Sequence, residues 1–197
     1  MNRRHSGFYS RILGQELGMT LYGHAGQPCL VFPSQNGKSQ DFEGFGMVEV
    51  CRPWIDAGRL RLYCVDSLDK QTWSAHHRPP RERIERHEAW FAHITEEFVP
   101  FIYRDSGHDG RLMALGCSLG AFHAANFTLQ RSDIAPLSIS LSGSYDPTGW
   151  RPWGEVGEAT YFANPPAYVA GAHGDHLEWL RSSANLLLVV GQGPFEW

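Results

Sequence analysis

Short apolar runs recur along the chain, and each run ends at a glycine, proline, aspartate or serine. Longer segments separate these runs, and in the longer segments apolar side chains recur every three or four residues. Short runs are typical of strands and the longer period is typical of helices, so the alternation predicts an α/β fold. The predicted strands are residues 29–32, 60–65, 112–115, 137–141 and 186–190, and the predicted helices are residues 45–57, 80–103, 119–130 and 175–182.

The runs at 29–32 (CLVF) and 186–190 (LLLVV) show no polar alternation. Parallel strands that are covered on both faces have this composition. The predicted helix 80–103 carries Ile84, Trp90 and Ile94 on one face, so we expect it to cover the sheet. No repeat or linker divides the 197 residues, and their number fits one domain spanning 1–197.

Residues 146–172 are rich in proline, glycine, tryptophan and tyrosine and have no sustained period. This composition predicts a long aromatic-rich loop with one short helical turn. Loops of this length are often walls of binding sites, and a packed surface excursion is the alternative. Trp150, Trp153, Tyr161 and Phe162 are the candidate pocket residues.

Composition restricts the class of partner. A formal charge of −4 lacks the clustered positive field that a nucleic acid requires. The N-terminus has no apolar signal core, and no later segment approaches the ~20 apolar residues that span a bilayer. We therefore expect no nucleic-acid partner, no membrane association and a cytoplasmic location. The cysteines lack CxxC spacing, which favours free thiols over a zinc site: Cys29, Cys51, Cys64 and Cys117.

The sequence GCSLG, residues 116–120, joins a predicted strand to a predicted helix. In a GxSxG turn the glycines permit a sharp reversal, which exposes the serine oxygen. Backbone N–H groups at the helix start then face the point where an oxyanion forms. This pattern predicts Ser118 as a nucleophile and the Leu119 N–H as an oxyanion donor. The alternative is an ordinary junction in which Ser118 caps the helix.

The chain resembles the α/β-hydrolase serine esterases of the esterase D-like group. Five blocks carry the resemblance, in the order in which that family presents them: GHAGQPCLVFPSQNG, RLYCVDSLDKQTW, GCSLGAFHAANFTL, SLSGSYD and YFANPPAYV. The resemblance implies a three-layer sandwich with a mostly parallel central sheet, a serine nucleophile, no cofactor, and hydrolysis of esters or thioesters. It also implies a second oxyanion donor after residues 29–32, with Gln35 as the leading candidate; a simple tight turn is the alternative there.

A serine nucleophile needs a base and an acid, and in this fold the chain order is serine, acid, histidine. Glu196 is the candidate acid after residues 186–190, although no histidine follows it. Asp146 is an alternative acid or a turn residue before Pro147. His176 is the candidate base if the aromatic loop folds over the site; the other interpretation makes it part of a helix start.

Other histidines are expected to be packed or solvated. His123 lies more than a turn beyond Ser118 on the predicted helix, so we expect it to pack inside the protein. His76, His77, His87 and His93 match no metal-site spacing, and no metal is expected.

The resembling family adds a further helix and strand beyond the part that matches residues 186–190, so the sandwich is expected to be short at its C-terminal side. We expect either a truncated version of a longer protein or a homodimer in which another chain covers this edge strand. Two functions remain: a serine carboxylesterase that hydrolyses small acyl esters through a Ser118 acyl-enzyme, and a catalytically impaired hydrolase-fold protein used for binding or assembly.

Overall fold

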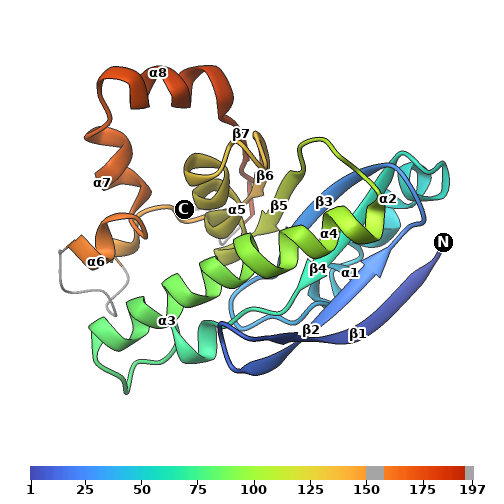
Figure 1. The fold of residues 1–197 in the computed structure, drawn as a ribbon, viewed down its shortest axis with the longest axis horizontal. Coiled ribbons are helices and arrows are strands. Elements are labelled where there is room, and N and C mark those ends of the chain that lie inside the picture. The colour runs from blue at the N-terminus through green and yellow to red at the C-terminus, as the bar shows by residue number, and fades with distance from the viewer. Residues whose placement is uncertain (150–157, 194–197) are drawn as a thin grey trace.

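A computed structural model describes residues 1–149 and 158–193 (Figure 1). In these residues the strands form one seven-stranded sheet in the order β1-β2-β4-β3-β5-β6-β7. The strands are β1 (Arg3–Ser10), β2 (Gln15–Tyr22), β3 (Gln27–Phe32), β4 (Leu60–Val65), β5 (Met113–Cys117), β6 (Leu137–Leu141) and β7 (Asn185–Val189). The α-helices are α1 (Asp41–Gly44), α2 (Met47–Asp56), α3 (Pro80–Ala92), α4 (Val99–Ser106), α5 (Leu119–Gln130), α6 (Glu158–Tyr161), α7 (Pro165–Ala170) and α8 (Gly174–Ser183).

The sheet is mostly parallel, as the sequence predicted. Strands β4, β3, β5, β6 and β7 run parallel to their neighbours, and the β1–β2 hairpin joins β4 in antiparallel orientation. The sequence analysis did not find this hairpin. Because β1 is an edge strand whose side chains are mostly exposed, it lacks the apolar run that marked the other strands.

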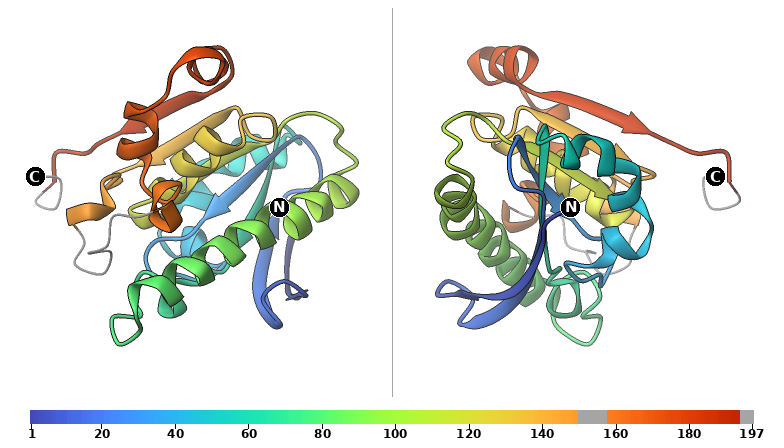
Figure 2. Two further views of the ribbon diagram at one scale, coloured as in Figure 1. Left: turned by 60° about the vertical axis from the view of Figure 1, so that its left-hand side comes forward. Right: turned by 90° about the vertical axis from the view of Figure 1, so that its right-hand side faces the viewer.

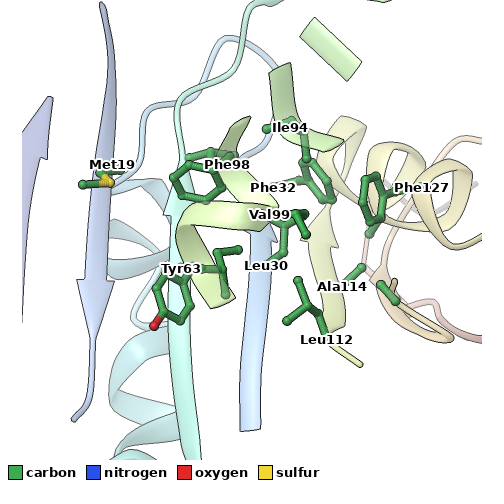
Figure 3. Close-up of a cluster of buried hydrophobic side chains, with 14 of the residues drawn as sticks. Met19, Leu30, Phe32, Tyr63, Ile94, Phe98, Val99, Leu112, Ala114 and Phe127 are labelled. Atoms are coloured by element: carbon green, nitrogen blue, oxygen red, sulfur yellow. The ribbon is translucent and has the colours of Figure 1, made fainter. Parts of the chain in front are cut away.

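Alternate side chains of the central strands bury two separate cores. Leu30 and Phe32 of β3 pack with helices α3, α4 and α5, and Figure 3 shows the Phe32 ring between Ile94 and Phe127. Cys29 and Val31 point to the opposite face, where α1 and α2 cover them. This period of two confirms that helices cover both faces of β3, and the two views in Figure 2 show the helices on either side of the sheet.

The predicted helix 80–103 consists of three segments instead of one. A π-helical segment, η2 (His93–Phe98), separates α3 from α4. Pro100, at the start of α4, has no N–H to donate to the carbonyl four residues earlier, and its ring crowds that carbonyl. The wider turn before Pro100 places the Glu97 carboxylate against the β1–β2 turn, where it accepts the Arg11 N–H at 2.9 Å and the Ser10 hydroxyl at 2.6 Å.

The segment after β6 also differs from the prediction. Its described part contains η3 (Pro147–Gly149) and the two short helices α6 and α7, where one helical turn was expected. Pro165 and Pro166 open α7, and proline is favoured at the first positions of a helix. Trp150 and Trp153 lie outside the described residues.

Strand β7 is the edge of the sheet (Figure 2, right), and its apolar side chains are exposed. Leu187 is 51% exposed and Leu188 is 54% exposed. The prediction that this run is covered on both faces is therefore wrong, because all five residues of β7 are exposed. Coverage of this edge by a second copy stays a prediction. Among the described residues, no helix combines the length and the apolar composition needed to cross a bilayer.

A substitution on β7 tests the expected homodimer. If a second copy pairs with this edge, the wild-type chain elutes as a dimer and Leu187→Lys as a monomer, because a charged edge side chain opposes strand pairing. At a concentration where the wild type is also monomeric, the melting temperature should change by no more than about 2 °C, since the side chain is exposed in the single chain. Val50→Lys, at an exposed apolar position on α2, is the control and keeps the wild-type elution. A wild-type chain that stays monomeric at every concentration measured by light scattering contradicts the expectation.

Candidate active site

Ser118 lies at a sharp turn between β5 and α5, and its side chain is exposed. Its backbone has φ of 57° and ψ of −122°, a left-handed conformation that non-glycine residues adopt only where their surroundings enforce it. The Ser118 N–H donates to the Leu141 carbonyl of β6 at 2.9 Å, which anchors the turn to the neighbouring strand. Ser118 occupies the N-cap position, but its hydroxyl makes no capping hydrogen bond. The geometry therefore does not support a capping role for this side chain.

The two glycines of GCSLG permit backbone contacts that any side chain would block. A Cβ on Gly116 would lie 2.1 Å from the Gly120 carbonyl oxygen. A Cβ on Gly120 would lie 2.4 Å from the carbonyl oxygen of Phe32 and 2.5 Å from that of Pro33. The first turn of α5 thus touches the end of β3, and this contact brings the loop 33–37 beside Ser118.

One backbone N–H of the loop 33–37 makes no hydrogen bond within the described residues. The Ser34 N–H donates to Asp41 Oδ2 at 2.9 Å, and the Asn36 N–H donates to Asp69 Oδ2 at 2.8 Å. The Gln35 N–H between them has no acceptor among the described residues, and the same is true of the Leu119 N–H at the start of α5. Of Ser34, Gln35 and Asn36, Gln35 is therefore the one with a backbone donor available for a ligand.

A buried polar cluster lies between this loop and α5. Asp69, on the 3₁₀ turn η1 (Asp69–Gln71), is 2% exposed, and its Oδ1 lies 3.5 Å from His123 Nε2. The His123 ring stacks on His87 with ring centroids 5.5 Å apart. Burial, aided by the nearby His123, lowers the pKa of His87 to about 3, so His87 is neutral near pH 7. Both histidines are packed inside the protein, as predicted.

The described part of the aromatic-rich segment 146–172 packs against α5. Ala163 packs with Leu119 and Phe122 in one buried cluster. Tyr161 and Phe162 contact Tyr168, with ring centroids 6.1 Å apart in each pair. Phe162 also lines a cavity of about 310 Å³ between α3 and α5. The described part of the segment thus supports the helix that begins at Ser118, and its role as a substrate pocket stays a prediction.

The predicted base is not in contact with Ser118. All ten histidines of the chain lie among the described residues, and none of them hydrogen-bonds Ser118. The His176 ring stacks on Trp179 within α8. Leu180 of α8 packs on Leu129, near the end of α5 that is farthest from Ser118.

Of the two candidate acids, Asp146 and Glu196, only Asp146 lies among the described residues. Asp146 is exposed and accepts the Thr148 N–H at 2.9 Å, as a turn residue before Pro147 does. Hydrogen bonds from Thr148 also lower the pKa of the Asp146 carboxyl. Glu196 lies outside the described residues.

Asp69 was not singled out from the sequence. It follows the predicted strand 60–65 in DSLDK, and acidic residues just beyond the carboxyl end of a parallel strand often reach a site at that edge. That position in the sequence was the signal that could have indicated Asp69. Its partner Asn36 lies on another strand's loop, so the contact itself depends on the pairing of β3 with β4.

Comparison with known proteins places this geometry in a known fold. No protein-family model and no curated protein matches the chain. Among solved structures, a ferulic acid esterase superposes with a TM-score of 0.73 at 15% identity, over 98% of this chain and 80% of that one. An S-formylglutathione hydrolase from Agrobacterium tumefaciens superposes with a TM-score of 0.70 at 14% identity, over 96% of this chain and 85% of that one. The Staphylococcus aureus fluorophosphonate-binding serine hydrolase F superposes with a TM-score of 0.64 at 11% identity, over 95% of this chain and 78% of that one.

The chain has the α/β-hydrolase fold. Ligands of open α/β sheets bind outside the carboxyl ends of the parallel strands. In this chain, that edge carries Ser118 after β5 and the loop 33–37 after β3.

The contact at Gly120 predicts a measurable loss of stability. In Gly120→Ala the new methyl group meets two backbone carbonyl oxygens, so β3 or α5 must shift, and we predict that the free energy of unfolding falls by about 1 to 3 kcal/mol. Gly44→Ala is the control, because a Cβ there meets no atom within 4 Å. Urea denaturation measures both variants. Equal stability of the two would contradict the close approach.

Proposed function

We propose that the protein is a serine hydrolase that cleaves carboxylic esters with a small acyl group through an acyl-enzyme on Ser118. One observation carries the proposal: an exposed hydroxyl on a strained strand-to-helix turn lies beside a loop and a helix start that each offer an unused backbone N–H. These N–H groups belong to Leu119 and Gln35.

The reaction follows from this arrangement. Ser118 Oγ attacks the ester carbonyl carbon, and the electron pair of the carbonyl moves onto its oxygen. The Leu119 and Gln35 N–H groups and the positive end of α5 stabilise that oxyanion. The intermediate collapses, the C–O bond to the alcohol breaks, and the proton lost by Ser118 ends on the departing alcohol. Water then attacks the acyl group, which releases the acid and restores Ser118.

The structural neighbours support this class of reaction. They include a ferulic acid esterase, an S-formylglutathione hydrolase and a fluorophosphonate-binding serine hydrolase. The proposal takes from them ester hydrolysis as a reaction type.

A second candidate is a hydrolase-fold protein that binds a ligand without efficient turnover. The observation in its favour is that no histidine among the described residues contacts Ser118. Serine is a weak nucleophile without a base, and an oxyanion hole alone retains about 10³- to 10⁴-fold of rate enhancement over water. The two candidates therefore differ in the reactivity of Ser118.

A fluorophosphonate probe separates the two candidates. If Ser118 is activated, the probe labels the wild-type protein once per chain, which intact-mass measurement detects, and Ser118→Ala abolishes the label. Ser182→Ala is the matched control, because Ser182 is an exposed serine on α8, and it keeps full labelling. A wild-type protein that stays unlabelled for hours favours the binding protein.

Hydrolysis of p-nitrophenyl acetate gives an independent measure. We predict that the Ser118→Ala rate falls to the buffer background, because the attacking oxygen is removed while the fold is kept. Circular dichroism confirms that the variant is folded. If the rate in Ser118→Ala equals the wild-type rate, the activity belongs to another group of the protein and the assignment of Ser118 is refuted.

A further inference from the structure

A single buried carboxylate connects the two elements that carry the unused backbone donors. Asp69 lies on η1, just beyond the carboxyl end of β4, and its side chain is 2% exposed. Its Oδ2 accepts the Asn36 N–H at 2.8 Å, and its Oδ1 lies 3.5 Å from His123 Nε2 on α5. The two oxygens of one side chain thus face the loop 33–37 and the helix that begins at Leu119.

On the loop side, Asp69 fixes the peptide next to the candidate donor. The peptide groups on either side of the Gln35 N–H are both anchored, one through the Ser34 N–H on Asp41 and the other through the Asn36 N–H on Asp69. Asn36 has φ of 60°, a left-handed conformation that asparagine adopts more readily than most residues. The hydrogen bond to Asp69 stabilises it and thereby sets the direction of the Gln35 N–H.

On the helix side, His123 lies one turn beyond Leu119 on the same face of α5. It is 3% exposed, and its Nε2 makes no hydrogen bond within the described residues, although Asp69 Oδ1 lies 3.5 Å from it. Trp90, with its ring centroid 4.8 Å from that of His123, holds the imidazole in place. A rotation or slide of α5 would change the distance between His123 and Asp69.

The segment after Asp69 makes a second connection to the loop. The Ser74 N–H donates to the Asp69 carbonyl at 2.7 Å, and Ser74 Oγ accepts the Gln35 side-chain amide at 2.9 Å. Residues 69–74 therefore contact the loop at two points. Asp69 binds the Asn36 N–H, and Ser74 binds the Gln35 side chain. Burying a carboxylate is unfavourable, and an apolar residue would avoid that cost but would bind neither the loop nor the helix.

We propose that Asp69 is a positioning residue for the oxyanion donors of Gln35 and Leu119. The proposal rests on the proposed function of Ser118. It assigns Asp69 no contact with substrate: the carboxylate acts through the Asn36 N–H and His123, and it keeps the two donors converged before substrate binds. Such preorganisation is where an oxyanion hole gains its effect.

The experiment measures how fast a fluorophosphonate reacts with Ser118 and what fraction of chains finally reacts. The variants are Asp69→Asn, Asp69→Ala and Ser74→Ala. The control is Asp105→Asn, which alters a largely buried carboxylate bonded to Arg61 and Tyr63, residues of β4 rather than of the site. Circular dichroism establishes the folded fraction of each protein.

We expect the second-order rate constant to fall about 10- to 100-fold in Asp69→Ala, because displaced oxyanion donors slow the reaction at Ser118 in every chain. The final labelled fraction should stay unchanged. Asp69→Asn should lose less, because its amide oxygen still accepts the Asn36 N–H. Ser74→Ala should lose about 2- to 10-fold, and Asp105→Asn should keep the wild-type rate per folded chain. A merely structural role would instead reduce the labelled fraction and leave the rate of the remaining chains unchanged.

Several outcomes overturn the proposal, and they differ from failure of the proposed function. A labelled wild type with unchanged rates in folded Asp69 variants overturns only the role of Asp69. If the Asp69 variants do not fold, an unchanged rate in Ser74→Ala overturns it as well. A wild-type protein that does not react at Ser118 overturns both proposals.

Discussion

The backbone of α5 begins so close to β3 that residue 120 has no room for a side chain. The carbonyl oxygens of Phe32 and Pro33 occupy the space where a Cβ would lie. This contact fixes where the helix starts, and so it fixes where the chain must turn at Ser118 to leave β5. The left-handed backbone of Ser118 is a consequence of these two ends being held, because β5 is paired on both sides and α5 is pressed against β3.

The rigidity of this junction comes from the residue that makes the contact. The Phe32 carbonyl abuts Gly120 while its buried ring packs against Trp90 and Phe127, with centroids 5.7 and 6.0 Å apart. The two faces of β3 are both buried, so the strand cannot shift toward solvent to relieve the contact. A close-packed strand of this kind holds a neighbouring loop in one position, which is what a site built from backbone N–H groups requires.

The sequence predicted those parts of the fold whose signal is local. Strands β4 and β6 and helix α5 have the predicted bounds, because their apolar runs and periods end at breaker residues. The exposed hairpin of β1 and β2 carries no such signal, and Pro100, which was inside the predicted helix, marks a π-helical break instead. Ser118 and Gln35 were found from a turn motif and a family resemblance. Asp69 was missed because its role depends on β4 and β3 lying side by side, although α1 and α2 separate them in sequence.

The described site is better equipped to stabilise a negative charge than to accept a proton. The N–H groups of Leu119 and Gln35 and the start of α5 all favour an oxyanion, whereas no described side chain accepts a hydrogen bond from Ser118. These two tasks also belong to different parts of the chain. The donors come from the loop after β3 and from α5, whereas the resemblance places the acid and the base after β7. Labelling by a fluorophosphonate and ester turnover both require removal of the Ser118 proton as well as stabilisation of negative charge, so the reactivity of Ser118 measures whether a base assists it.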